Sequence, residues 1–350
     1  MLPPLPLIDG CLFIDNSGWM ESMSTCYRYL QYKSLNLRIP AAGKPSLNFG
    51  SAIHLALEHR YRKYGTGYVD DQFYNEVAAM FTEFFAKNEA PEGDWRTLNW
   101  AMTLLRRYVE RYDLETFNLL SDKEGKPMVE LSFALPLFTW KGMAEHPEAG
   151  WVDWEVPIIY TGRIDLPIQI DDQIFVMDHK TTSTFVFGPS MSFKSFFDAM
   201  KMSAQQKGYC WAFRELTGVK PAGYMVNAIR TAEPPQYVLT GKESSRTNRE
   251  GIKATPEKWW NDSFQRERFI LEDKELDEWR DNTIALVEEF FYNYSKGIMP
   301  MKTAWCTAYG RCPYLDVCSL PSDTRDVMLS SDLFTDNTWT PLNKPTQSKQ

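Results

Sequence analysis

The chain has 350 residues, 43% of them hydrophobic, which is enough to bury a sizeable core. Its formal net charge of -8 argues against a nonspecific nucleic-acid coat protein, because such proteins bind phosphate through a strongly basic surface. The N-terminal sequence MLPPLPLIDG has no basic segment followed by a long apolar stretch, and no window holds the roughly 18 uncharged apolar residues that span a bilayer. We therefore expect a soluble protein of the cytoplasm that does not enter a membrane.

The N-terminal third of the chain is predicted to be helical. Apolar residues recur at three- and four-residue spacing in the segments 20–35, 49–64, 71–87 and 97–114. From residue 128 the pattern changes to short runs that alternate or are rich in β-branched residues, at 128–138, 157–170 and 173–182. Such runs, separated by turn residues, are typical of strands.

The remainder of the chain mixes both patterns. A long helix is predicted over 192–216, strands over 222–230 and 235–241, and helices between 256 and 295. From residue 321 the chain is rich in Ser, Thr, Asp, Asn and Pro and poor in apolar residues, so we expect 321–350 to be a flexible tail.

Two acidic residues stand at the ends of neighbouring predicted strands. Asp165 closes GRID, and Asp178 opens DHK, whose lysine, Lys180, points to the same side of the strand because side chains alternate with period two. Carboxylate oxygens are the ligands that Mg²⁺ prefers, and an ammonium beside them can orient water or stabilise charge on a phosphate. Taken alone, the same residues are far more typical of turn-forming acids and a solvated lysine.

Four segments in a fixed order make the sequence resemble the PD-(D/E)XK nucleases, in their RecB-like and Cas4-like branch. These segments are FGSAIHLALEHRY, GRID, DHK and QQKGY, and the resemblance spans roughly residues 20 to 320. It implies an α/β fold with a restriction-endonuclease-like core, in which a central mixed sheet is flanked by helices, and a helical N-terminal elaboration. It also implies one nuclease domain over 1–320, with its helical part at 20–120, its catalytic core at 125–245 and C-terminal helices with a cysteine segment at 256–320.

The resemblance also implies roles for individual residues. His54, Asp165 and Asp178 would be the metal ligands, and Lys180 the catalytic lysine. Gln205 and Tyr209 match the Q-x-x-x-Y motif, and their spacing of four places them on one helical face.

Two of the candidate residues have a simpler interpretation as well. His54 could pair with Glu58 one helical turn later. Glu130 is a candidate active-site acid, but it could equally be an outward-facing strand residue in MVELSF.

Six cysteines occur in the chain, and four of them form a pattern. The distant Cys26, together with Cys306, Cys312 and Cys318, resembles the cysteines that hold a [4Fe-4S] cluster in part of this nuclease branch. Zinc is the alternative metal, and buried small hydrophobic side chains are the interpretation without a metal. Cys11 and Cys210 we expect to be of this last kind.

The resemblance predicts a DNA nuclease that uses Mg²⁺ or Mn²⁺, most simply an exonuclease of recombination, repair or replication from a bacteriophage or bacterium. The expected partners are DNA and a helicase, single-strand-binding or recombination protein, in the host cytoplasm if a phage encodes the enzyme. A nuclease-fold protein that binds without cutting, and an endonuclease on the same fold, are the alternatives.

Overall fold

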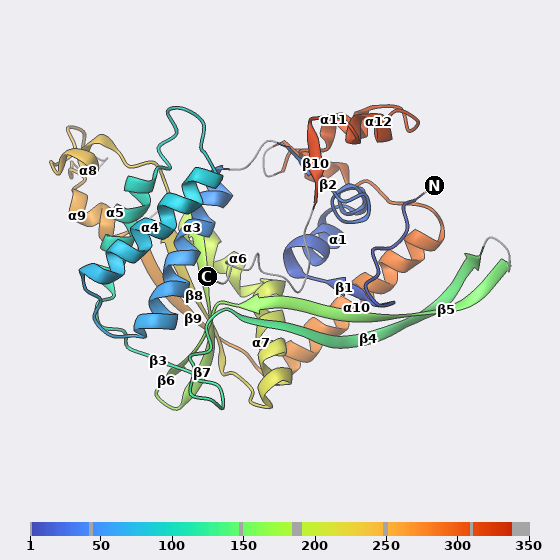
Figure 1. Cartoon of the computed structure of the whole chain (residues 1–350), viewed down its shortest axis with the longest axis horizontal. Coiled ribbons are helices and arrows are strands. Elements are labelled where there is room, and N and C mark those ends of the chain that lie inside the picture. Colours follow the sequence, from blue (N-terminus) through green and yellow to red (C-terminus); the bar gives the residue numbers. More distant parts are fainter. Residues whose placement is uncertain are drawn as a thin grey trace. The chain divides into compact units, whose positions relative to one another are not determined.

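The structure, a computed structural model, describes residues 2–41, 45–146, 150–183, 191–247, 251–308 and 311–337 (Figure 1). Its chain divides into two compact units. Unit 1 comprises Met1–Ala42, Ser132–Arg163 and Asp273–Gln350, and unit 2 comprises Gly43–Leu131 and Ile164–Glu272. The single domain expected for 1–320 stays a prediction, but the units do not follow the expected boundaries, because each joins segments that are far apart in the sequence.

Unit 2 is built on a five-stranded sheet in the order β3-β6-β7-β8-β9. Its strands are β3 (Asn118–Leu119), β6 (Leu166–Ile170), β7 (Gln173–Thr182), β8 (Gly223–Arg230) and β9 (Phe264–Ile270). Only β7 and β8 run parallel, and the other neighbours are antiparallel. The sheet is therefore mixed, which agrees with the expected α/β class.

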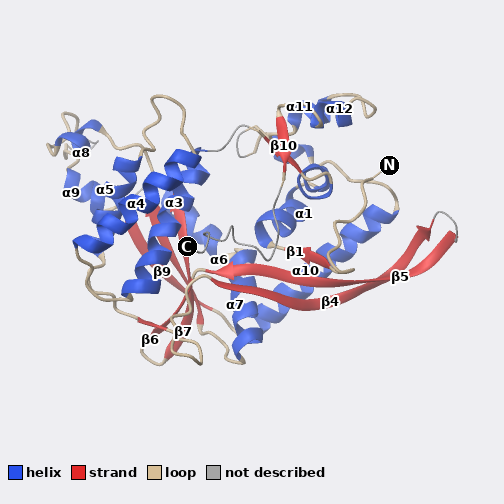
Figure 2. Cartoon of the chain, in the orientation of Figure 1, coloured by secondary structure: helices blue, strands red, loops and turns tan. Residues whose placement is uncertain are grey.

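Helices α3 (Pro45–His59) and α7 (Ala204–Thr217) pack against this sheet (Figure 2). The other helices of unit 2 are the π-helical η3 (Arg60–Tyr64), which continues α3, and α4 (Asp71–Lys87), α5 (Leu98–Arg111), α6 (Met191–Lys201), α8 (Gln236–Thr240) and α9 (Pro256–Asn261). Helices α3, α4 and α5 share one hydrophobic core with the sheet residues Phe175, Met177 and Met225. Helix α7 contacts β7 and β8, and its Gln206 reaches the side chain of Asp178, which points away from that core.

Unit 1 contains a three-stranded and a two-stranded sheet. Its strands are β1 (Leu12–Ile14), β2 (Arg38–Pro40), β4 (Leu131–His146), β5 (Gly150–Ile164) and β10 (Phe334–Asp336). Its helical elements are η1 (Asn16–Met20), α1 (Glu21–Thr25), α2 (Tyr27–Leu30), η2 (Gln31–Leu35), α10 (Asp273–Ser295), η4 (Thr303–Cys306), α11 (Leu315–Ser319) and α12 (Arg325–Leu329). No helix in the described part of the chain is long and apolar enough to cross a membrane.

Three predicted elements differ from the structure. The strand expected at 157–170 is interrupted at Asp165, where the chain leaves β5 and enters β6 in another sheet. The helix expected at 192–216 is two helices, because the backbone of Ser203 is extended. The strand expected at 235–241 is the short helix α8, which Pro235 precedes and the left-handed Gly241 ends.

Two further differences lie towards the C-terminus. The helical pattern expected between 256 and 295 contains β9, which pairs with β8 and buries Phe264 and Phe269 on opposite faces of the sheet. The expected flexible tail forms α12 and β10 within 321–337, and β10 pairs with β2. Residues 338–350 of that expected tail lie outside the described residues.

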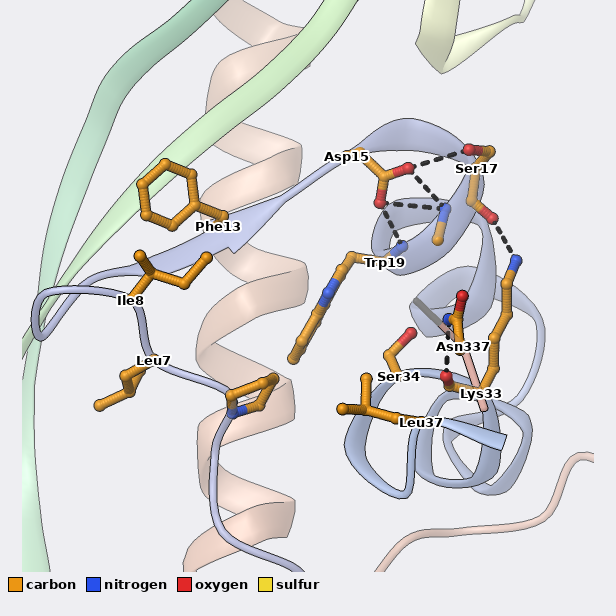
Figure 3. Close-up of a pocket in the computed structure, with 12 residues that line it drawn as sticks. Leu7, Ile8, Phe13, Asp15, Ser17, Trp19, Lys33, Ser34, Leu37 and Asn337 are labelled. Atoms are coloured by element: carbon orange, nitrogen blue, oxygen red, sulfur yellow. Dashed lines mark hydrogen bonds between the residues drawn. The ribbon is translucent and has the colours of Figure 1, made fainter. Parts of the chain in front are cut away.

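A pocket in unit 1 is lined by N-terminal segments and by Asn337 (Figure 3). Its polar side chains bind main-chain groups: Asp15 accepts from the N–H groups of Gly18 and Trp19, and Lys33 Nζ donates to the carbonyl of Ser17 over 2.8 Å. Asn337 Nδ2 donates to the carbonyl of Lys33 over 3.0 Å. The bond from Asn337 and the pairing of β10 with β2 attach the C-terminal segment to the N-terminal segment, which explains why residues 321–337 do not form a free tail.

The pairing of β8 with β9 generates a first prediction. A Cβ atom on Gly223 would lie 1.9 Å from the carbonyl oxygen of Phe269, and this main-chain atom cannot rotate away. Gly223→Ala should therefore lower the free energy of unfolding by about 1–3 kcal/mol, the usual range for overpacking. Chemical denaturation of the metal-free protein measures the change.

Gly67→Ala is the matched control, because its new Cβ would meet nothing closer than the carbonyl of Tyr64 at 4.0 Å. Equal stability of the two variants would contradict the close approach of β8 and β9.

Candidate metal centre

Three side chains with metal-binding atoms converge in unit 2. His54, Glu130 and Asp165 each offer a ligand atom, and these atoms lie within 4.8 Å of one another. His54 lies on α3, Glu130 directly precedes β4, and Asp165 lies between β5 and β6. Within the described residues this is the one group of three or more His, Cys, Asp or Glu side chains that meets this spacing.

Asp165 is held at the centre of this group. Its Oδ2 accepts a hydrogen bond from the main-chain N–H of His179 over 2.8 Å, and the same oxygen lies 3.6 Å from Nδ1 of His54. Burial raises the pKa of Asp165 well above its usual value, and the negative charges of Asp178 and Glu130 raise it further.

Whether a divalent cation fits the site depends on this concentration of negative charge. Crowded carboxylates repel one another unless a cation or a proton reduces their charge. Two carboxylates and one imidazole are donors that Mg²⁺ or Mn²⁺ accepts. The residues present therefore fit the expected metal.

His54 offers a nitrogen that suits this purpose. Its removal from water lowers the pKa of the imidazole, which favours the neutral form that binds metals. Glu58, the alternative partner expected from the sequence, forms an ion pair with Arg62 at 3.0 Å.

Glu130 was the least certain of the expected site residues, and the structure places it in the group. Its φ of 54° lies in the left-handed region, which a non-glycine residue rarely adopts. Its main-chain N–H donates to the carbonyl of Asp165 over 2.8 Å. Strained backbone of this kind is often kept where a side chain must point to a functional site.

Asp178 lies beside the group without belonging to it. Its side chain is 3% exposed, and Oδ2 accepts from Lys180 Nζ over 2.8 Å and from Gln206 Nε2 over 2.9 Å. Both donors bind the same oxygen, Oδ2. The other oxygen, Oδ1, is therefore the atom of Asp178 that could take part in metal binding. The three ligands expected from the sequence were His54, Asp165 and Asp178, and in the structure Glu130, rather than Asp178, meets the 4.8 Å spacing with the first two.

Lys180 connects the strand motif with the helix motif. Its Nζ donates to Gln205 Oε1 over 2.8 Å, and Gln205 Nε2 donates to the hydroxyl of Tyr209 over 3.0 Å. The structure thus brings together all six residues that the motifs named, and their catalytic roles stay predictions.

Sequence reasoning missed two buried residues that touch the site. Gln206 is 0% exposed and binds Asp178, although it occupies an unspecified position of the Q-x-x-x-Y motif, directly after Gln205. His179 is 4% exposed and supplies the N–H that holds Asp165. The sequence did not single out either residue. Each is the chain neighbour of a motif residue, and its side chain points in a different direction from that of the motif residue.

The structure does not support the [4Fe-4S] cluster expected in unit 1, nor its zinc alternative. Among the described residues, no three of Cys26, Cys306, Cys312 and Cys318 bring their sulfur atoms within 4.8 Å of one another. Cys312 and Cys318 instead pack as apolar side chains against a hydrophobic cluster formed by Tyr32, Tyr314, Val317, Leu329 and Phe334. Cys210 is fully buried, as expected, whereas Cys11 is only partly buried.

The family model described as the PD-(D/E)XK nuclease superfamily matches residues 20–319. No curated protein matches the chain. Among solved structures, one titled "Crystal structure of SSO0001" is 12% identical and covers 68% of this chain and 74% of that one, with a TM-score of 0.19. So low a TM-score carries no argument.

Helix α3 must approach β7 closely for His54 to reach the group, which generates a second prediction. A Cβ on Gly50 would lie 2.6 Å from Oγ1 of Thr181. Gly50→Ala should push α3 away from β7 and weaken Mn²⁺ binding roughly tenfold, a loss typical of disturbed metal surroundings. Calorimetric titration with Mn²⁺ measures the affinity.

The double variant Gly50→Ala with Thr181→Ala removes the clashing oxygen and should recover most of the affinity. If Gly50→Ala binds Mn²⁺ as the unaltered protein does, His54 is not held by this approach.

The position of Glu130 generates a third prediction. Glu130→Gln keeps the size of the side chain and removes its charge, so it should weaken Mn²⁺ binding at least about tenfold if ligand charge sets the affinity. Glu124→Gln, at an exposed position with 72% side-chain exposure, is the control and should leave the affinity unchanged. Equal affinities of the two variants would remove Glu130 from the ligand set.

Proposed function

The chain belongs to the PD-(D/E)XK nuclease superfamily, and from this premise we propose that it is a metal-dependent deoxyribonuclease, an exonuclease of the RecB-like and Cas4-like branch. The observation that carries the proposal is the meeting of His54, Glu130 and Asp165 within 4.8 Å beside the pair of Asp178 and Lys180. A phosphodiesterase that uses a metal needs carboxylates and a cationic donor at one place.

The residues divide into those that would hold the metal and those that would act on the substrate. His54, Glu130 and Asp165, with Oδ1 of Asp178, would hold Mg²⁺ or Mn²⁺. The bound ion would neutralise charge on the scissile phosphate and acidify a water molecule. These are the donors that such an ion accepts.

Lys180 would act on the substrate directly. Its ammonium is held by Asp178 and Gln205, each at 2.8 Å, so it keeps one orientation without a substrate. From that position it would donate a hydrogen bond to a phosphate oxygen and stabilise the charge that develops during cleavage. Tyr209 would support this orientation through Gln205.

The finer parts of the proposal are supported by the resemblance of the motifs. A histidine on an N-terminal helix and a Q-x-x-x-Y helix, represented by His54, Gln205 and Tyr209, are the features typical of the RecB-like and Cas4-like branch. We accordingly assign the enzyme to DNA recombination, repair or replication in the cytoplasm, that of the host if a bacteriophage encodes it. A helicase, a single-strand-binding protein or a recombination protein would be its partner.

The fourth prediction tests this function. The purified protein, incubated with linear duplex, linear single-stranded and covalently closed circular DNA, should degrade linear DNA with Mg²⁺ or Mn²⁺ and should be inactive with chelator. Asp165→Ala should lower the rate at least about 100-fold, the order lost when one preorganised electrostatic group is removed. Gel electrophoresis of the products over time measures the rate.

Asp172→Ala, which removes an exposed carboxylate from the turn between β6 and β7, is the matched control and should leave the rate unchanged. Cutting of closed circles would replace the exonuclease with an endonuclease. DNA binding without cutting would replace the enzyme with a binding protein of the same fold.

A further inference from the structure

His179, between the two motif residues of β7, faces away from both of them. Side chains alternate along a strand, so His179 points towards α3 and the core, whereas Asp178 and Lys180 point towards α7. Its ring stacks on Tyr61 with centroids 5.8 Å apart and planes 10° apart. It meets the ring of His54 edge to face at 5.9 Å. The buried ring therefore touches the metal group from behind.

Asn227 holds this ring from the neighbouring strand. It lies opposite His179 in the parallel register of β7 and β8, and it is fully buried. Its amide is 2.7 Å from Nδ1 of His179, and the same Nδ2 donates to the hydroxyl of Tyr108 over 2.9 Å. Its Oδ1 accepts from Nε of Arg266 over 3.2 Å.

The direction of these bonds determines the tautomer of His179. The guanidinium of Arg266 has only donors, so the amide oxygen of Asn227 must face it. The amide nitrogen then faces His179, where it donates, and Nδ1 of His179 must be the acceptor. The ring proton consequently lies on Nε2.

Arg266 is itself held in place, so the amide of Asn227 cannot easily turn over and reverse its hydrogen bonds. Its guanidinium binds both oxygens of Glu115, whose side chain is fully buried, and it donates to the hydroxyl of Tyr108 over 2.8 Å. Tyr61, the ring on which His179 stacks, donates to Glu115 over 2.7 Å. One buried network thus binds His179 by its ring face and by its Nδ1.

We infer that Asn227 is a positioning residue of the metal centre: by fixing the His179 ring, it holds the His179 N–H on Asp165 and the ring edge against His54. This inference rests on the proposed function. Its basis is that His179 contacts two of the three metal-binding side chains, one through the main chain at 2.8 Å and one through its ring. Residues that orient metal ligands typically change metal affinity 10- to 100-fold when they are altered.

Asn227→Asp tests the inference in the full chain. The carboxylate keeps the size of the side chain and an acceptor for Arg266, but it has no N–H for Nδ1 of His179. The proton of His179 should therefore move to Nδ1, and the dissociation constant for Mn²⁺ should rise about 10- to 100-fold. The electron paramagnetic resonance signal of free Mn²⁺ during titration gives the affinity.

Nuclear magnetic resonance of ¹⁵N in the histidine rings reports the tautomer directly, in the metal-free protein. The chain has only four histidines, and His179→Gln identifies the signal of His179. The unaltered protein should show an unprotonated Nδ1 at His179, and Asn227→Asp a protonated one.

Ser263→Ala is the control for a merely structural effect. It removes a fully buried hydroxyl that donates to the carbonyl of Trp259 over 2.7 Å, in the same unit but outside the hydrogen bonds that hold His179. It should lower thermal stability and leave Mn²⁺ affinity unchanged. If Asn227→Asp does not fold, Tyr108→Phe removes one partner of Asn227 and should weaken Mn²⁺ binding in the same direction.

Each further outcome decides between the two proposals. Unchanged Mn²⁺ affinity in a folded Asn227→Asp protein, or a proton on Nδ1 of His179 in the unaltered protein, overturns the positioning role of Asn227. Mn²⁺ binding without DNA cleavage by the unaltered protein overturns only the proposed function. Absence of Mn²⁺ binding by the unaltered protein overturns both.

Discussion

The parallel pairing of β7 with β8 is the constraint on which the site depends. A parallel pair requires a crossover, and here the crossover contains α7, which lies against the face of β7 that carries Asp178 and Lys180. The opposite face is covered by α3, which brings His54 to it. Strand β7 therefore presents functional side chains on both faces, and the helices α3 and α7 add further functional side chains on each side.

The antiparallel pairing of β6 with β7 places Asp165, directly before β6, close to Asp178 on β7, and the fold must offset the repulsion of these carboxylates before any metal binds. Asp165 receives a main-chain N–H, and Asp178 receives Lys180 and Gln206. The main-chain N–H stabilises the charged form of Asp165, while burial and the neighbouring acids oppose the ionisation of this side chain. A cation bound at this place would offset the remaining repulsion between the carboxylates.

The sequence allowed prediction of those parts of the site that depend on local periodicity. Lys180 follows Asp178 at strand spacing, and Tyr209 follows Gln205 at helix spacing. Each spacing alone predicts that the two side chains of the pair lie side by side. Strand β9 could not be recognised, because it lies between two helical patterns and its pairing with β8 is a long-range contact. The predicted metal site at the cysteines is not supported for a related reason. The spacing of the cysteines is equally compatible with apolar packing, which the structure shows for Cys312 and Cys318.

The buried network behind His179 could not be predicted, because its members come from η3, α5, β8, β9 and a loop. Arg60 and Arg266 are both buried with Glu115, so this network has more positive than negative charge. Its arginines lower the pKa of His179, after the larger effect of burial and the contribution of His54. A histidine kept neutral in this way adds no positive charge beside His54, where such a charge would repel a bound cation.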